Sequence, residues 1–132
     1  MREIKFRAKS GTQWRYGDLY HNDHGELMIY EPKTKGRTLD GGTVDGWRIV
    51  VNSETVGEFT GLTDEDGREI YEGDIVRNET TDEVGVVFYH NAEFLVKGAN
   101  DRFTLIRFVY SDYGCTVIGN VYDNPGLLEQ TS

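Results

Sequence analysis

The sequence predicts an all-β or β-dominated α+β fold, in which antiparallel hairpins form a small barrel-like or sandwich core. Two observations lead to this class. Apolar and polar residues alternate with a period of two in most of the apolar segments, which is the pattern of half-buried strands. Turns rich in glycine, aspartate and asparagine separate these segments at short intervals. One or two short helical turns are expected near the C-terminus.

The first third of the chain predicts three consecutive strands. The segment EIKFRA alternates around Ile4 and Phe6, and the turn SGTQ joins it to QWRYGDLY as a hairpin. The polar turn HNDHGE leads into ELMIYE, which ends at Pro32 because proline has no N–H to donate to a strand ladder. Residues 32–46 contain four glycines and only two aliphatic residues, so we expect a long loop there.

Further strands follow at similar spacing along the rest of the chain. We predict them at WRIVV (47–51), EVGVVFYH (83–90), EFLVK (93–97) and CTVIGNVYDN (115–124). The run TVGEFTGL (55–62) leads into the acidic segment, and within IYEGDIVR (70–77) a glycine turn at Gly73-Asp74 precedes a strand that begins at Ile75. Residues 100–111 fit both a helical stripe and strand alternation, and we favour a short helix or 3₁₀ turn. Asn124 followed by Pro125 is typical of a helix N-cap and first position, which predicts one final turn.

These elements predict a single domain of 132 residues, or two β lobes within it: N-terminal hairpins at 1–51 and a barrel-like part at 55–128. No apolar run approaches the roughly 18–20 residues that span a membrane, and the N-terminus has no apolar signal region. The single cysteine, Cys115, cannot form an intrachain disulfide, so we expect a reducing, cytoplasmic setting. It lies beside an apolar strand, which predicts a buried structural thiol.

Charge is distributed unevenly between the two halves of the chain. Residues 1–58 carry nine Lys/Arg and nine Asp/Glu, whereas residues 59–132 carry five and fourteen, so the net charge of −9 lies in the second half. Acidic surfaces repel phosphate backbones, which disfavours nucleic-acid binding there. The first half offers a candidate set of nucleic-acid contacts: Arg2, Lys5, Arg7, Lys9, Arg15, Lys33, Lys35 and Arg37. The alternative is a solvated strand edge, where lysines discourage edge-to-edge pairing.

The acidic segment TDEDGREIYEGDIV is interpreted as two turns of a β-sheet. An Asp-Gly pair between extended runs is a strong hairpin signal, because glycine accepts a positive φ. A calcium loop with Gly67 at its sixth position would need ligands at Leu62 and Gly73, which have no side-chain oxygen. A phosphate loop would need a lysine and a helix after its glycines. The predicted turn residues are Asp64, Asp66, Gly67, Gly73 and Asp74.

His21 and His24 form the best metal-like pair in the sequence, with Asp18 or Asp23 as an oxygen ligand. They are weak candidates, because structural zinc usually takes four ligands that include cysteines, and histidines in polar turns are commonly exposed. No local signature of a nucleophile and its base is present. We therefore assign no catalytic residue and no cofactor, and favour a protein that is not an enzyme.

Several motifs resemble the YopX family of phage- and prophage-encoded proteins. They are EIKFRA, YGDL (16–19), TVGEFTGLTDEDGREIYEGDIV (55–76), GVVFY (85–89) and VIGNVYDNPGLL (117–128). Two departures are modest: Gly126 stands where the family usually has an acidic helix former, and Asn52-Ser53 lacks a proline often seen there. The resemblance implies a β-rich fold, a bacterial host cell and self-association, but no reaction.

The sequence therefore leads to two functional expectations. The first is a phage or prophage accessory protein, a non-enzymatic, homo-oligomeric interaction module. It is expected to act on a host or phage protein and not to bind a membrane. The alternative is a nucleic-acid-binding protein that uses the basic N-terminal strands and the 32–46 loop. The sequence has eight Tyr, six Phe and two Trp. Aromatic side chains on strands can stack bases of single-stranded nucleic acid, although core and interface packing is the more common role.

Overall fold

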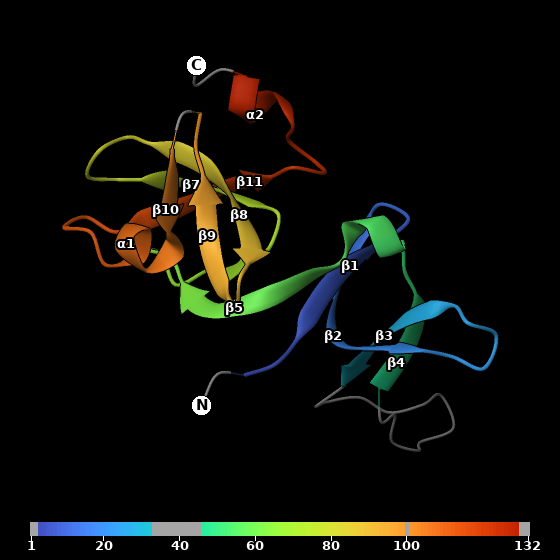
Figure 1. Ribbon diagram of the computed structural model, residues 1–132. Coiled ribbons are helices and arrows are strands. Elements are labelled where there is room, and N and C mark those ends of the chain that lie inside the picture. Colours follow the sequence, from blue (N-terminus) through green and yellow to red (C-terminus); the bar gives the residue numbers. More distant parts are fainter. Residues whose placement is uncertain (1–2, 33–45, 100, 130–132) are drawn as a thin grey trace. The chain divides into compact units, whose positions relative to one another are not determined.

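The structure is a computed structural model that describes residues 3–32, 46–99 and 101–129 (Figure 1). Strands dominate this part of the chain, and two short helices lie in its last third. The β-dominated fold expected from the sequence is confirmed. The chain divides into two compact units, residues 3–58 and 59–129 of the described part.

The division between the two units falls inside one strand, β5 (Gly57–Thr63). Gly57 and Glu58 pair with the first strand of the chain, whereas Phe59 and Thr63 pair with the strand that follows β5. The lobes predicted as possible from the sequence are 1–51 and 55–128, and β5 supplies ladder hydrogen bonds within each of the two units.

The first unit is an antiparallel meander with the strand order β4-β3-β2-β1, followed by the start of β5. Its elements are β1 (Phe6–Ser10), β2 (Gln13–His21), β3 (Leu27–Pro32), β4 (Gly46–Val50) and the 3₁₀ turn η1 (Ser53–Thr55). One side of the sheet forms a small core, in which Ala8 and Ile29 are fully buried and Val51 nearly so. Leu19, Leu27, Ile49 and Val56 pack against them.

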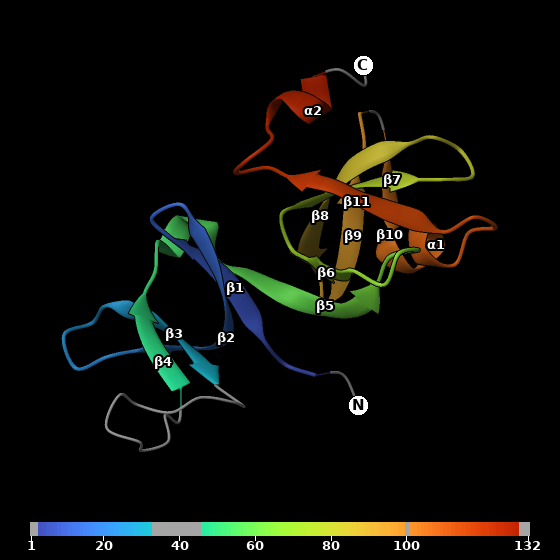
Figure 2. The same ribbon diagram turned by 180° about the vertical axis from the view of Figure 1, so that it is seen from behind.

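The second unit is a five-stranded antiparallel sheet with the order β10-β9-β8-β7-β11. Its strands are β7 (Asp74–Asn78), β8 (Val84–His90), β9 (Glu93–Lys97), β10 (Arg102–Thr104) and β11 (Cys115–Asn120), and β6 (Glu69–Tyr71) pairs with β5. Four strands follow one another as a meander, and the fifth returns to pair with the first of them. Figure 2 shows β11 running beside β7, with which it pairs antiparallel.

Two short helices complete the second unit, α1 (Leu105–Val109) and α2 (Gly126–Glu129). Leu105 and Phe108 of α1 enter the core and join Ile70, Val76, Val87, Val96 and Cys115. In the described part of the ambiguous segment, 101–111, the strand β10 (Arg102–Thr104) leads directly into α1. In the described part of the chain, neither helix has the length and apolar character needed to cross a bilayer.

Candidate functional site

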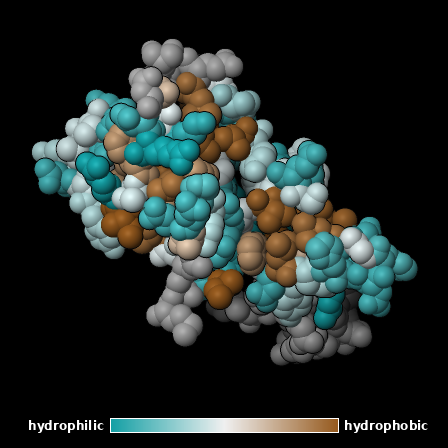
Figure 3. All heavy atoms as spheres, in the orientation of Figure 1, coloured by the Kyte–Doolittle hydropathy of each residue, from teal (hydrophilic) through white to brown (hydrophobic). Residues whose placement is uncertain are grey.

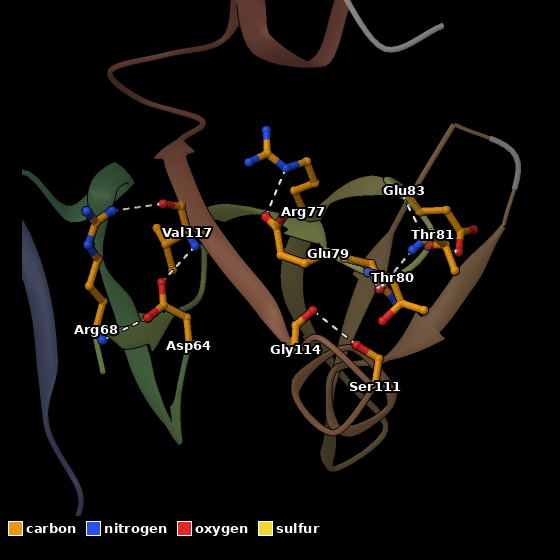
Figure 4. Close-up of polar contacts among 11 residues, drawn as sticks. Asp64, Arg68, Arg77, Glu79, Thr80, Thr81, Glu83, Ser111, Gly114 and Val117 are labelled. Atoms are coloured by element: carbon orange, nitrogen blue, oxygen red, sulfur yellow. Dashed lines mark hydrogen bonds and ion pairs between the residues drawn. The ribbon is translucent and has the colours of Figure 1, made fainter. Parts of the chain in front are cut away.

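Asp64 is a buried carboxylate that ties the β5–β6 turn to β11. Its Oδ1 accepts hydrogen bonds from the backbone N–H groups of Asp66 and Arg68, each at 2.9 Å. Its Oδ2 accepts from the N–H of Val117 at 2.9 Å (Figure 4). The Arg68 guanidinium donates to the Val117 carbonyl at 3.0 Å. Asp64 therefore binds backbone amides on both sides of its hairpin and on a distant strand.

Gly73 and Asp74 form the second acidic turn, between β6 and β7. Asp74 is almost fully buried, and its Oδ2 accepts a hydrogen bond from the Tyr71 N–H at 2.7 Å. Gly73 has φ of 90°, which glycine adopts without strain. Its N–H donates to the Val87 carbonyl and its carbonyl accepts from Val121 N–H, both at 2.9 Å. This turn thus connects neighbouring strands on either side of β7.

The predicted histidine pair lies at the exposed turn between β2 and β3. His21 and His24 are both exposed. In the described residues, no group of three or more His, Cys, Asp or Glu side chains is placed to hold a metal ion. The side chain of Asn22 organises the turn: its Oδ1 accepts from the N–H groups of His24 and Glu26 at 3.0 and 2.9 Å.

Cys115 is fully buried in the core of the second unit. Burial raises the pKa of its thiol from 9.0 to about 12, and the charges of Asp64, Glu79 and Glu65 add to this effect. A thiol with such a pKa carries very little thiolate near neutral pH, so it is a poor nucleophile.

The predicted cationic residues of the first unit are engaged in different ways. Lys5 is 3.6 Å from Glu3, and Arg15 forms an ion pair with Glu31 at 3.2 Å and a hydrogen bond with Gln13. Arg7 is buried, with its guanidinium 4.6 Å from the centre of the Trp14 ring. Lys9 lies 5.6 Å from the same ring centre. Arg2, Lys33, Lys35 and Arg37 lie outside the described residues.

An aromatic and cationic surface forms on the side of the first sheet that faces away from Ala8 and Ile29. Lys9 lies directly opposite Trp14, and Arg7 opposite Tyr16, across β1 and β2. On the neighbouring pair of strands, Tyr30 lies opposite Arg48, whose guanidinium is 5.4 Å from the Tyr30 ring centre. Sequence reasoning did not include Arg48 in the basic set. We call this surface, made of Arg7, Lys9, Trp14, Tyr16, Tyr30 and Arg48, the aromatic face.

A groove runs along α1 in the second unit, and sequence reasoning missed it. It has a volume of about 540 Å³. The turn between β7 and β8 forms one wall and α1 with the following loop forms the other. Its lining residues are Asn78, Thr80, Thr81, Glu83, Phe103, Ile106, Arg107, Phe108, Tyr110, Ser111 and Asp112. We call it the α1 groove.

A second hollow of about 300 Å³ adjoins the α1 groove and shares Thr81, Glu83 and Phe103 with it. Four carboxylate residues line the two hollows, and Arg107 is the single cationic residue among their lining residues. The carboxylates are Asp82, Glu83, Asp101 and Asp112. The combined surface is therefore strongly acidic around an aromatic floor.

Side-chain hydrogen bonds fix the β7–β8 turn that walls the α1 groove (Figure 4). Asn78 Oδ1 accepts from the N–H groups of Thr80 and Thr81 at 2.9 and 3.3 Å. Thr81 Oγ1 donates to Glu83 at 2.8 Å, and Thr80 Oγ1 accepts from the Tyr113 N–H at 3.0 Å. The wall is thereby preorganised and joined to the loop after α1.

Glu79 adds a further anchor at the base of this turn. Hydrogen bonds, first from Thr116 and then from Arg77, hold the pKa of the Glu79 carboxyl below its usual value. The Arg77 Nε donates to Glu79 Oε1 at 2.9 Å. On the other wall, Ser111 Oγ donates to the carbonyls of Phe108 and Gly114 at 2.9 and 3.0 Å. The first wall is thus fixed to β7 and β11, and the second is fixed within α1 and the loop that follows it.

The fold and these surfaces can be compared with known proteins. The family described as YopX protein matches residues 5–129. The chain belongs to the YopX family. The resemblance inferred from the motifs is thereby confirmed. The chain is also similar to a solved structure, the crystal structure of protein EF1440 from Enterococcus faecalis, with a TM-score of 0.58 and 22 % sequence identity. The match covers 97 % of this chain and 99 % of that chain, and at this identity it shows a shared fold.

No curated protein matches the chain significantly. The motifs that carry the family resemblance in the second unit include the two acidic turns around Asp64 and Asp74. The α1 groove instead lies on residues 78–83 and 103–112, mostly outside those motifs. One sequence signal was available for it. In the sequence, Phe103, Ile106 and Tyr110 fit a helical stripe, which competed with strand alternation; the structure places Ile106 and Tyr110 of that stripe on the outer side and buries Leu105 and Phe108 instead.

Proposed function

We propose that this YopX-family chain is a non-enzymatic interaction module that binds a partner protein in the α1 groove. The observation that carries the proposal is the pairing of exposed apolar side chains with a fixed acidic wall. Ile106 and Tyr110 are 60 % and 73 % exposed, and they lie one helical turn apart on the same side of α1. Exposed apolar clusters rimmed by polar residues are typical of protein interaction sites.

The partner segment is proposed to be cationic, with at least one apolar anchor side chain. Asp82, Glu83, Asp101 and Asp112 supply negative charge along the two hollows. Complementary charge steers encounter and selects among partners, whereas burial of apolar area supplies most of the affinity. Figure 3 shows hydrophobic atoms among hydrophilic ones on the visible surface of the second unit, which fits such a mixed site.

The residues around the groove have separable roles in this proposal. Leu105 and Phe108 are buried and support the fold, whereas Ile106 and Tyr110 on the same helix turn outward. Because an outward isoleucine contributes little to a monomer's core, its substitution should leave folding intact. This separation allows binding to be tested without loss of the fold.

Fluorescence anisotropy with labelled synthetic peptides tests the proposal. The probes are a leucine–lysine peptide, a leucine–glutamate peptide of equal length and a glycine–lysine peptide of equal charge. We expect the leucine–lysine peptide to bind best, more weakly at high salt, and the leucine–glutamate peptide not to bind. Ile106→Lys should abolish binding.

Ile4→Lys is the matched control, since Ile4 is 64 % exposed but belongs to the first unit. It should bind as the unchanged protein does. Equal loss in both variants, or equal binding of the leucine–glutamate peptide, would contradict the proposal.

Self-association and an accessory role in a phage or prophage belong to the same proposal, because the family resemblance implied them. One structural feature supports self-association: among the described strands, β4 is the last in its sheet, and it exposes Trp47 and Val50, at 50 % and 46 %. Unpaired edge strands with exposed apolar residues are common sites of strand addition. Sedimentation at micromolar concentration should show an oligomer, and Trp47→Lys should shift it toward the monomer. A strictly monomeric protein would contradict this part.

A further inference from the structure

We propose that the aromatic face of the first unit binds single-stranded nucleic acid. In this proposal the rings of Tyr16, Trp14 and Tyr30 stack unpaired bases, and Lys9 and Arg48 contact phosphates. The site lies on a different unit from the α1 groove and rests on separate observations, so neither proposal depends on the other.

Strand register places the aromatic side chains on one side of the sheet. Side chains two residues apart on a strand point to the same side, so Trp14, Tyr16 and Asp18 share a side of β2. Asp18 lies opposite Tyr30, and Tyr30 opposite Arg48. The neighbouring positions Leu19 and Ile29 point to the other side, where they enter the core. The three rings therefore form a row across β2 and β3.

The three aromatic rings are partly exposed, so a ligand can reach them, while the strands hold the backbone positions from which they project. Tyr16 is 42 % exposed, and Trp14 and Tyr30 are partly exposed. Arg7 is only 6 % exposed, so it supports the Trp14 ring from within the sheet and is not itself a phosphate contact. Stacking on an aromatic ring contributes about 1–3 kcal/mol per base in single-strand binders, and it does not require a particular base.

Among the described strand positions on this face, cations outnumber carboxylates, although the whole chain carries −9. Arg7, Lys9 and Arg48 lie on it, and within these strand pairs Asp18 is the carboxylate that shares their side. The negative excess belongs to residues 59–132. Proteins that bind single-stranded nucleic acid combine cationic side chains, which contact the phosphate backbone, with aromatic rings, which stack on unpaired bases.

A single strand fits this face better than a duplex does. Bases in a duplex are stacked on one another and present only their edges in the grooves, so rings on a sheet cannot reach their faces. In the described part of the first unit, the elements are strands and one 3₁₀ turn, without a helix of the kind that enters a major groove. The proposed ligand class is therefore single-stranded DNA or RNA, bound with little sequence preference.

Tryptophan fluorescence tests the proposal, because the chain contains only Trp14 and Trp47. Trp47 lies opposite Glu31, one position away from the Tyr30–Arg48 pair, and so points to the other side of the sheet. The two variants Trp47→Phe and Trp14→Phe each leave one reporter. The probe is an oligothymidylate of about 15 nucleotides, which spans a typical single-strand site.

We expect the oligothymidylate to quench Trp14 in the Trp47→Phe protein at low salt, with the affinity falling as salt rises. Trp47 in the Trp14→Phe protein should be quenched little. In the Trp47→Phe background, Tyr16→Ala should weaken binding about ten-fold or more. Arg48→Ala should weaken binding and reduce the salt dependence by about one phosphate contact.

Lys97→Ala is the control for loss of an exposed cation, since Lys97 lies in the second unit. It should leave the affinity unchanged. Circular dichroism of each variant shows that it is folded. Three results would overturn the proposal: no quenching of Trp14 at low salt, equal quenching of both tryptophans, or equally tight binding of the corresponding duplex.

Discussion

The carboxylate of Asp64 accepts a hydrogen bond from the backbone N–H of Val117, which is 53 residues away in the sequence and 2.9 Å away in space. The same carboxylate accepts two further backbone N–H groups in its own hairpin. In the sequence, this acidic turn looks most like a ligand site. In the structure, its buried carboxylate instead accepts hydrogen bonds from three backbone N–H groups. It closes the second unit by joining β11 to the β5–β6 hairpin.

Replacing Asp64 should therefore be costly. Asp64→Ala leaves three partly buried N–H groups without their acceptor, and we expect the free energy of unfolding to fall by about 2–4 kcal/mol. Urea denaturation followed by far-UV circular dichroism measures it. Asp66→Ala, at an exposed position of the same turn, should change stability by no more than about 0.5 kcal/mol. Similar losses in the two variants would contradict the assigned role of Asp64.

Gly17 should tolerate no side chain, because β2 and β3 approach closely there. A Cβ atom built at Gly17 would lie 1.9 Å from the Tyr30 carbonyl oxygen. We expect Gly17→Ala to destabilise the first unit by at least about 2 kcal/mol, since the backbone itself must move. Both tryptophans lie in this unit, so their fluorescence during urea denaturation follows it directly. Gly126→Ala is the control, because a Cβ there meets nothing within 4 Å. A transition midpoint unchanged by Gly17→Ala would contradict the prediction.

The two sides of α1 should respond differently to truncation. Phe108 is 1 % exposed and packs in the core, so Phe108→Ala should lower the free energy of unfolding by about 3–5 kcal/mol. Ile106 lies on the outer side, so Ile106→Ala should change the free energy of unfolding by no more than about 0.5 kcal/mol. Thermal and urea unfolding of both variants measure the difference. A large loss in Ile106→Ala would assign that residue to the fold instead of the groove.

The raised pKa of Cys115 predicts how the protein responds to alkali. The folded-state pKa, about 12, exceeds the ordinary thiol value of 9.0, so folding favours the protonated thiol. This contribution is fully present below pH 9, and it is lost as the pH rises from 9 toward 12. The free energy of unfolding should therefore decline over that range. Measured relative to the value at neutral pH for the same protein, the decline should be smaller in Cys115→Ala.

Thiol labelling provides an independent measurement on the same residue. Cys115 is the single cysteine and is fully buried, so a thiol reagent should label it only after unfolding at neutral pH. The labelling rate should follow the population of unfolded protein as urea is raised. Rapid labelling of the native protein would contradict the buried environment described for this thiol.

The strands and turns of this protein could be predicted from local patterns. The Asp66-Gly67 pair and the proline at position 32 each act over a few residues, and the structure has a turn at the first and the end of β3 at the second, whereas the strand predicted from Ile4 begins only at Phe6. The segment 100–111 could not be predicted fully, because β10 and α1 share it. Of its apolar residues, Leu105 and Phe108 pack in the core, whereas Ile106 and Tyr110 are exposed on the outer side.

The sequence by itself determined the β-dominated class, the family and the uneven charge of the two halves, because alternation, turn residues and composition are local or additive properties. The tertiary structure alone decided that β5 serves two units, that Asp64 reaches Val117, and that Trp14, Tyr30 and Arg48 share one side of a sheet. It also decided that the β7–β8 turn and α1 enclose a groove. These relationships depend on strand register and on how the sheet curls, which bring together residues that no short stretch of sequence contains.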